Sequence, residues 1–290
     1  MKRTLSLVVI VAAAAALATF GRTFKAGPGP LHSYVDATAH AAPATPAAEP
    51  QRQGNEFRLR EPLAAGRTLE VRGINGGVSA EPSGSGEFEV VATKRARKSD
   101  PDEVRIEVVR HAGGVLICAV YPNPDGEPNT CELENSRSRV RDNDTTVNFT
   151  VRVPAGVNFE GRTVNGKVEA ERLSGDVDVK TVNGSINVST TGLARAATVN
   201  GSITAVLGRA DWPSGLEFKT VNGGIDLTLP ASLSARVEAK TLNGEITSDF
   251  PMTVTGAFSR RRLSGTIGGG GDRQLILETV NGSVQIRRAS

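Results

Sequence analysis

The chain has 290 residues, of which 32 are glycine and only 4% are aromatic. So few bulky side chains argue against a conventional globular core, whereas a narrow core of short β-branched side chains fits this composition. The net charge of +3 is small, so electrostatics give no reason to expect a nucleic-acid partner.

The N-terminus has the pattern of an export signal. Lys2 and Arg3 precede an apolar run over residues 5–17, and residues 16–18 (Ala-Leu-Ala) are a small-x-small cleavage site. The run is shorter than the roughly 20 apolar residues that span a membrane. We therefore predict residues 1–25 to be a cleaved signal peptide, with an uncleaved signal anchor as the alternative. The protein is expected to be exported to the periplasm or the cell surface, or to be held at the membrane by this segment.

Residues 26–54 are rich in Ala and Pro and have no hydrophobic period, as residues 41–46 illustrate. Such a composition predicts a semi-rigid extended linker that takes no part in a core. The linker either holds the folded part away from a membrane or wall, or has no role of its own.

Residues 55–160 are predicted to form an N-terminal β region. Strands are expected near 87–92, 104–109 and 145–153. In the last of these Val147, Phe149, Val151 and Val153 share one face, while polar residues share the other. These strands are longer and more strictly amphipathic than those that follow. They are suited to cap the N-terminal end of a repeat array.

The same region contains the two cysteines of the chain, Cys118 and Cys131. An even number of cysteines in an exported protein predicts a disulfide. It would close a loop of 14 residues, counting both cysteines, and contribute about 3 kcal/mol to stability in the chain-entropy model. No metal site is expected, because the chain has three histidines. Two of them lie in the linker, and His111 stands alone.

The rest of the chain repeats one phrase, Thr-Val-Asn-Gly-x-Val/Ile. It occurs at residues 163–168, 181–186, 198–203, 220–225, 241–246 and 279–284, with a degenerate copy at 262–267 and an outlying one at 74–78. Repetition at this period is typical of one supersecondary unit stacked on itself. We therefore predict an all-β fold in which residues 161–290 form a β-solenoid of short stacked strands.

Each phrase is predicted to be the corner of a coil. Stacking would align the asparagines, whose side-chain amides can then form a ladder, while glycine permits the bend. The predicted turn residues are Asn165, Gly166, Asn183, Gly184, Asn200, Gly201, Asn222, Gly223, Asn243, Gly244, Asn281 and Gly282.

Strand alternation predicts which side chains of each coil point inward. The threonines and other small polar residues are expected to face solvent. One interior column is predicted to contain Val164, Val182, Val199, Val221, Leu242 and Val280. A second is predicted to contain Val168, Ile186, Ile203, Ile225, Ile246, Ile267 and Val284.

An antiparallel meander is the rival fold, because Asn-Gly between apolar runs is also a strong hairpin signal. The asparagines at 165, 183, 200, 222 and 243 are separated by 18, 17, 22 and 21 residues. A meander would need equally regular turns at the opposite end of each strand, and the segments there resemble one another poorly. A turn at residues 174–175, midway between two corners, indicates two strands per coil.

The chain resembles the bacterial DUF4097 family of adhesin-like proteins over about residues 68–288. Residues 151–157, 163–168 and 173–179 carry the resemblance, through alternating Asn-Gly-x-Val/Ile and Ser-Gly-Asp-Val/Ile motifs. The resemblance implies a β-solenoid exposed in the cell envelope, and it brings no catalytic residues with it.

Three classes of function are open to such a fold: an enzyme, a binding protein and a structural scaffold. An enzyme is not expected, since residues 163–290 contain no histidine and the position after Asn-Gly is acidic only at Glu245. No catalytic, cofactor-binding or metal residue is therefore predicted. Two carboxylates brought together in a groove with raised pKa values would favour an enzyme after all.

An adhesin-like binding role is the first prediction. Its partner would be surface polysaccharide, cell wall or another envelope protein. Trp212 and the basic runs at 94–98, 137–141 and 260–262 are candidate contacts, although each also fits a structural or solvated role. The alternative is an envelope scaffold that self-associates through its solenoid ends. A bare, apolar terminal coil would favour the scaffold, and a capped or charged one would favour surface binding.

Overall fold

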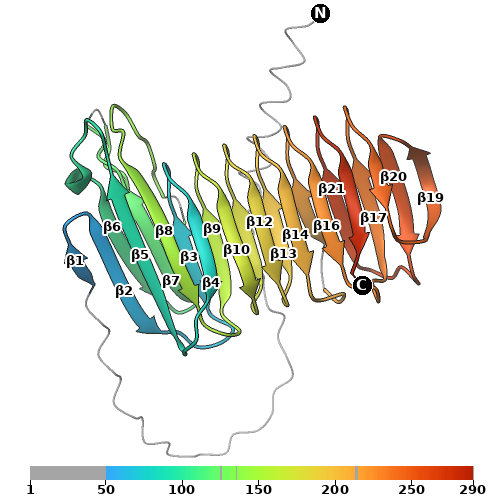
Figure 1. Cartoon of the computed structure of the whole chain (residues 1–290), viewed down its shortest axis with the longest axis horizontal. Coiled ribbons are helices and arrows are strands. Elements are labelled where there is room, and N and C mark those ends of the chain that lie inside the picture. Colours follow the sequence, from blue (N-terminus) through green and yellow to red (C-terminus); the bar gives the residue numbers. More distant parts are fainter. Residues whose placement is uncertain (1–49, 125, 135, 213–214, 290) are drawn as a thin grey trace, which may run out of the picture. The chain divides into compact units, whose positions relative to one another are not determined.

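The structure, a computed structural model, describes residues 50–124, 126–134, 136–212 and 215–289. Strands in these ranges form two sheets, A and B, whose members lie side by side in a row from β1 and β2 to β19 and β20 (Figure 1). The predicted signal peptide and residues 26–49 of the predicted linker lie outside the described residues.

Sheet A contains 11 strands within the described ranges. In spatial order they are β1 (Gln51–Gln53), β2 (Glu56–Pro62), β5 (Glu87–Arg95), β8 (Thr146–Val153), β4 (Val78–Pro82), β10 (Val168–Leu173), β12 (Ile186–Thr190), β14 (Ile203–Leu207), β16 (Ile225–Leu229), β22 (Val284–Arg288) and β18 (Ile246–Ser248).

Sheet B also contains 11 strands in the part of the chain that is described. Their spatial order is β19 (Met252–Ser259), β20 (Arg262–Ile267), β17 (Ala235–Lys240), β21 (Gln274–Glu278), β15 (Leu216–Lys219), β13 (Ala194–Ala197), β11 (Val177–Lys180), β9 (Asn158–Arg162), β3 (Thr68–Arg72), β7 (Gly114–Val120) and β6 (Arg105–His111). One turn of 3-10 helix, η2 (Pro101–Glu103), precedes β6.

Each coil consists of one strand of sheet B, an Asn-Gly corner and one strand of sheet A. The strands of successive coils pair in parallel and in register, as in β9, β11 and β13 or β10, β12 and β14. The predicted solenoid with two strands per coil is therefore confirmed, and the meander is excluded.

The solenoid starts upstream of the repeat array. Strands β3 and β4 form a coil whose corner is the outlying phrase at 74–78, and Asn75 bridges Asn165 directly. The chain between these two corners builds β5 to β8 before it returns to the stack. Both sheets therefore run without a break across residue 160.

The second predicted interior column is confirmed except at one position. Val168, Ile186, Ile203, Ile225 and Val284 are buried and pair in register through sheet A, and Ile246 is half-buried at its end. Stacked β-branched side chains of this size fill the narrow space between the sheets, which explains why the chain manages with few aromatic residues.

The first predicted interior column was wrong. Val164 and Leu242 are 37% and 52% exposed, whereas all six threonines that precede this column are buried. The alternation of a strand holds only while the chain stays extended, and Val-Asn-Gly lies outside the strands. Of the column as predicted, Val182, Val199, Val221 and Val280 are half-buried.

The hydroxyl of each buried threonine donates a hydrogen bond to a glycine carbonyl of the neighbouring coil. Thr181 Oγ1 donates to the carbonyl of Gly166 at 2.8 Å, and Thr198 Oγ1 donates to that of Gly184 at 2.9 Å. The same bond recurs, at 2.7–2.8 Å, at Thr163, Thr220, Thr241 and Thr279. A hydroxyl can be buried at little cost in free energy when a carbonyl acceptor replaces its hydrogen bond to water. The methyl group of the threonine packs in the core.

The degenerate copy at 262–267 is not a corner. These residues form β20, which pairs antiparallel with β17 so that Ile267 lies opposite Ala235 in sheet B. Ile267 is buried but does not belong to the sheet A column. The segment has Ser264 where a corner has asparagine, so it lacks the amide that the stack requires.

The coils are not stacked in chain order. The C-terminal coil, β21 and β22, lies between the coil of β15 and β16 and the coil of β17 and β18. Asn281 accordingly bridges both Asn222 and Asn243. Four consecutive glycines, at 268–271, lead from β20 across the start of β17 to β21.

Antiparallel strands extend both sheets at one end of the stack and sheet B alone at the other. At one end β5 pairs antiparallel with β8 and β2, and β6 pairs antiparallel with β7. The strands expected near 87–92, 104–109 and 145–153 therefore lie at the end of the stack that they were expected to cap. Residues 51–53, at the end of the predicted linker, join this end as β1. At the other end β20 and β19 extend sheet B beyond β17.

The corner glycines have no room for a side chain, and this predicts a clear substitution effect. A Cβ at Gly184 would lie 2.0 Å from the carbonyl oxygen of Gly166. We expect Gly184→Val to lower the free energy of unfolding by about 2–3 kcal/mol or more, measured by urea denaturation. The neighbouring Ser185→Ala is the control, and should stay within about 0.5 kcal/mol because Ser185 is exposed. Equal unfolding midpoints for the two variants would contradict the packing described for this corner.

Candidate functional site

The corners of the coils form a continuous amide ladder. Asn165 Nδ2 donates to Asn75 Oδ1 at 2.9 Å, and Asn183 Nδ2 donates to Asn165 Oδ1 at 2.8 Å. The series continues at 2.7–2.8 Å through Asn200, Asn222, Asn281 and Asn243, in that spatial order. The structure thus brings together all six predicted turn asparagines, with Asn75 as a seventh member.

The six predicted turn glycines lie directly beside the ladder. Each approaches the backbone of a neighbouring coil so closely that a Cβ would lie 2.0–2.1 Å from a carbonyl oxygen. Their role is therefore close packing of backbones, with the φ angle of Gly223 and Gly282 (158°) as a secondary feature. These residues build the fold and offer no reactive group.

The outer face of sheet A is a flat polar surface. One column runs through Thr150, Ser79, Glu169, Asn187, Thr204, Asp226, Gln285 and Thr247, all in register. Beside it Ser189, Val206, Thr228 and Arg287 form a shorter column. Short hydroxyl and amide side chains dominate the middle of the face, so it presents hydrogen-bonding groups at the spacing of the strands, about 4.8 Å.

The outer face of sheet B has a different chemistry, a ladder of charges. Glu160 lies in register between Glu70 and Asp178, and two residues further along Arg162 lies between Arg72 and Lys180. The two columns break at β13, where Arg195 follows Asp178 and Ala197 follows Lys180. Farther along the sheet Glu278 lies between Lys219 and Lys240, while Ile276 lies between Glu217 and Glu238. Acidic and basic side chains are thus neighbours along this face, in separate columns on β3, β9 and β11 and in mixed order beyond them.

Ion pairs link these two columns within and between strands. Glu70 Oε1 lies 2.6 Å from Arg72 Nε and 3.3 Å from Arg162 Nε, and Glu160 Oε2 lies 3.0 Å from Arg162 Nη2. Sequence reasoning did not find this ladder. The signal was present as an acid-x-base triplet just before a corner phrase, as at 160–162, 178–180, 217–219 and 238–240.

Glu160 is the carboxyl of the ladder whose pKa is raised. Burial raises the pKa of its carboxyl, and the charges of Glu70 and Asp178 raise it further. A raised pKa in a group of neighbouring carboxyls is part of what would favour an enzyme. Here, however, Glu70 and Glu160 contact arginines and Asp178 lies 3.6 Å from Lys180, so all three carboxylates are engaged by basic side chains.

The loop between β7 and β8 covers one end of sheet B. Cys118, on β7, and Cys131, in the loop, form a disulfide with a Cα–Cα distance of 5.8 Å. Arg72 Nη1 donates to the carbonyl of Glu132 at 2.7 Å and to Ser136 Oγ at 2.9 Å. The two predicted disulfide residues thus tie this loop to β7, and Arg72 ties it to β3.

Buried polar groups close the base of the loop. The hydroxyl of Tyr121 donates to the carbonyl of Thr145 at 2.8 Å, and burial raises the Tyr121 pKa to about 12. Asn129 Nδ2 donates to the carbonyls of Tyr121 and Arg139 at 2.9 Å and 2.6 Å. Tyr121 therefore stays protonated and keeps its donor role at physiological pH.

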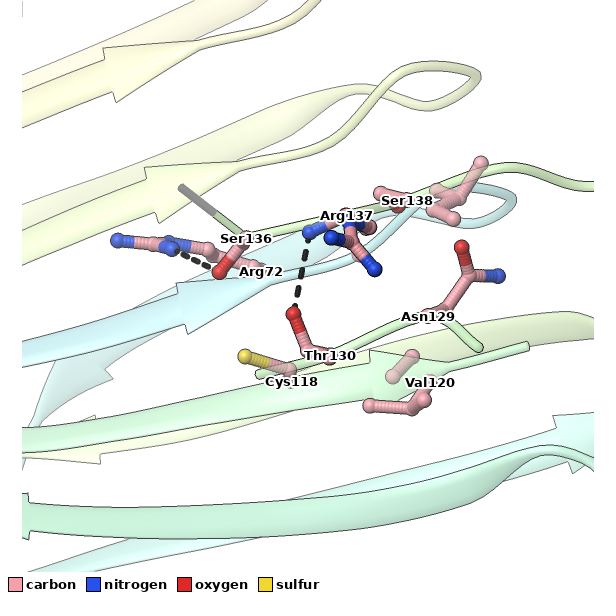
Figure 2. A pocket seen from close by; sticks show the side chains of 11 residues that line it. Arg72, Cys118, Val120, Asn129, Thr130, Ser136, Arg137 and Ser138 are labelled. Atoms are coloured by element: carbon pink, nitrogen blue, oxygen red, sulfur yellow. Dashed lines mark hydrogen bonds between the residues drawn. The ribbon is translucent and has the colours of Figure 1, made fainter. Parts of the chain in front are cut away.

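A small cavity lies beneath this loop (Figure 2). Its wall includes Arg72, Cys118, Asn129, Thr130 and Arg137, and dashed lines mark the bonds from Arg72 to Ser136 and from the Arg137 backbone to Thr130. With a volume of about 40 Å³ it has space for roughly three water molecules. A cavity of this size does not admit a sugar ring or a cofactor.

The other candidate contacts are structural or dispersed. Trp212 is only 4% exposed, and its Nε1 donates to the carbonyl of Gln274 at 3.2 Å, so it covers the core. In the basic runs, Lys94 pairs with Asp102, Arg137 with Glu127 and Arg260 with Glu245. Across the described ranges no three His, Cys, Asp or Glu side chains gather in a group that could hold a metal ion.

The comparison with family models agrees with the family resemblance. Residues 160–287 match the model of the family described as Toastrack DUF4097, which confirms the resemblance predicted from the corner motifs. A crystal structure of a protein described as a "putative cell adhesion protein", from Clostridium sporogenes ATCC 15579, is similar over 83% of this chain and 100% of that chain. The sequence identity is 11% and the TM-score is 0.44. No match to a curated protein was found.

No helix in the described residues is both long enough and apolar enough to cross a membrane.

The charge ladder predicts a pH-dependent stability effect. Because the pKa of Glu160 is higher in the folded chain than its ordinary value of 4.5, its ionisation disfavours folding as the pH rises above that value. We expect Glu160→Gln to raise the melting temperature at neutral pH, and the gain to disappear as the pH falls below about 4. Glu171→Gln, an exposed change on β10, should have no such effect. A lower melting temperature for Glu160→Gln at neutral pH would refute this account of the ladder.

The disulfide predicts a sensitivity to reductant. The loop it closes spans a sequence separation of 13 residues, so reduction should lower the free energy of unfolding by about 3 kcal/mol. The measurement is urea denaturation with and without reductant. A Cys118→Ala/Cys131→Ala double variant should unfold alike under both conditions, at the midpoint of the reduced protein. A wild-type midpoint that reductant leaves unchanged would count against the bond.

Proposed function

We propose that this protein is exported to the cell envelope and has a non-catalytic, adhesin-like role, in which the outer face of sheet A binds surface polysaccharide. The observation that carries the proposal is the in-register polar surface of that face. Export rests on the predicted signal in residues 1–25.

The chemistry of the face suits a neutral polymer. Asn187, Thr204 and Thr228 offer both donors and acceptors, and most of their neighbours in the two columns are also uncharged. Large flat aromatic platforms are missing from these two columns, so each coil would contribute only weak contacts. A polymer that crosses several coils adds these contacts within one binding event, which raises the overall affinity by avidity.

The ends of the solenoid support a lateral binding surface over end-to-end assembly. Antiparallel strands follow the last parallel coils, β5 and β6 at one end and β20 at the other. The turn from β19 to β20 also brings exposed Arg260 and Arg261 to the corner of the last coil, where their carbonyls accept from Ile246 N and Thr241 N. One end is therefore capped in both sheets, and the other is capped in sheet B and charged at its corner, which favours surface binding over a scaffold.

A non-catalytic role is supported by the state of the carboxylates. Glu70 and Glu160 are engaged by arginines, and the nearby cavity is too small for a sugar. A glycosidase needs two carboxyl groups across a space that admits substrate. In the ladder these carboxylates are occupied by ion pairs, which supports a role other than glycoside hydrolysis.

The proposal is tested by placing a long charged side chain in the middle of the face. Thr204 is exposed on β14, and Thr204→Arg would lift any polymer away from the neighbouring coils. In a glycan array and a pull-down with isolated cell-wall polysaccharide, we expect wild-type protein to bind. The variant should bind at least about tenfold more weakly, a loss of about 1.4 kcal/mol.

Thr253→Arg is the matched control, because Thr253 is exposed on β19 of sheet B. It adds the same charge and should leave polysaccharide binding unchanged. Thermal melts must show that both variants are folded. Failure of the wild-type protein to bind any polysaccharide, or equal loss in both variants, would overturn the proposal.

A further inference from the structure

We propose that Asn243 is a site of spontaneous deamidation, and that the stack protects the other corner asparagines from the same reaction. The chain contains seven Asn-Gly steps, one at each corner. They are alike in sequence, so any difference in reactivity must come from the fold.

The reaction at an Asn-Gly step joins two groups of adjacent residues. The backbone nitrogen of the glycine attacks the Asn Cγ, a C–N bond forms, and the side-chain nitrogen leaves as ammonia. Water then opens the resulting succinimide at one of its two carbonyls, which gives aspartate or isoaspartate. One water is consumed and one ammonia is released. The attacking nitrogen must lose its proton, so a hydrogen bond from this N–H to an acceptor slows the reaction.

In six of the seven corners this N–H is engaged. The glycine N–H donates to the carbonyl of the asparagine in the neighbouring coil, for example from Gly184 to Asn200 at 2.9 Å. The same bond, at 2.9–3.0 Å, is made by Gly76, Gly166, Gly201, Gly223 and Gly282. All six bonds point in the same direction along the stack, from β4 towards β18.

The direction of this series determines which corner is left over. Asn243 and Gly244 belong to the coil of β17 and β18, and β18 is the last strand of sheet A. No further corner follows to offer a carbonyl, and none of the described residues accepts a hydrogen bond from Gly244 N–H. Asn243 is exposed, and its side chain is held by a single bond, from Nδ2 to Asn281 Oδ1 at 2.7 Å.

Asn75, at the opposite end of the ladder, has the reverse arrangement. Among the described residues its Nδ2 has no hydrogen-bond partner, but the adjacent Gly76 N–H donates to Asn165 at 2.9 Å. The carbonyl of Val147 also lies against Gly76, where a Cβ would approach it to 2.1 Å. Comparing these two corners therefore separates the effect of a free glycine N–H from that of a free amide.

Deamidation at Asn243 would weaken the last coil. The product carries a carboxylate where Nδ2 now donates to Asn281 Oδ1, so two acceptors would face each other. Isoaspartate would in addition lengthen the backbone by one methylene and shift β18 against β22. The modification would thus loosen the end of the stack and leave the interior coils intact.

The test uses the wild-type protein, incubated at mildly alkaline pH and analysed by peptide mapping with mass spectrometry. We expect the peptide with Asn243 to deamidate more than about tenfold faster than the others, because those corners must first break a hydrogen bond and separate packed coils. In strong denaturant all seven should react at similar rates, which shows that the selectivity comes from the fold.

Two outcomes would overturn the proposal. One is a native-state rate at Asn243 no higher than at Asn200 in the middle of the ladder. The other is a rate at Asn75 that equals or exceeds the rate at Asn243, since it would mean that the free amide controls the reaction. Asn243→Gln, which disfavours the five-membered ring, should remove the early modified species while leaving the other peptides unchanged.

Discussion

The architecture depends on the hydrogen bond from a corner glycine to the asparagine carbonyl of the neighbouring coil, which six of the seven corners make. This bond brings backbones so close that only glycine fits, and it places each asparagine where its amide can reach the next. The buried threonine hydroxyl then donates to the glycine carbonyl of the neighbouring corner, as from Thr181 to Gly166. Because one phrase satisfies donors and acceptors between coils, repeating it extends both sheets at once and keeps every outward column in register.

The corner chemistry and one core column could be predicted from the sequence, because near-identical phrases imply equivalent positions. The positions of Val164 and its equivalents could not, since strand alternation was extended through residues where the chain bends. The place of the C-terminal coil was equally hidden. Its phrase at 279–284 matches the phrases of the other corners. The sequence therefore does not distinguish which two coils it lies between. The acid-x-base triplets are present in the sequence, but the ion pairs between them depend on β9 and β11 being neighbours, which the triplets do not predict.

The two outer faces show how one framework presents different surfaces. On sheet B, long acidic and basic side chains pair within and across strands, so their charges are largely neutralised locally. On sheet A the central positions carry short uncharged groups such as Asn187 and Thr204. The core beneath both faces is of the same kind, so outward residues can vary with little effect on stability. A family built on this framework can therefore diversify its surfaces while its corners stay alike.

The interposed C-terminal coil has a consequence for the order in which the chain can fold. Strands β17 and β18 are complete before residues 274–288 have been synthesised, yet their native neighbours are β21 and β22. A growing chain can stack its coils one after another only as far as β16. Residues 235–267 cannot pair with their native neighbours in the stack until the last residues have been added. The glycines at 268–271 connect this segment to those residues. Growth of this solenoid from one end therefore stops short of completion, and its final step is an insertion that closes the stack from the C-terminus.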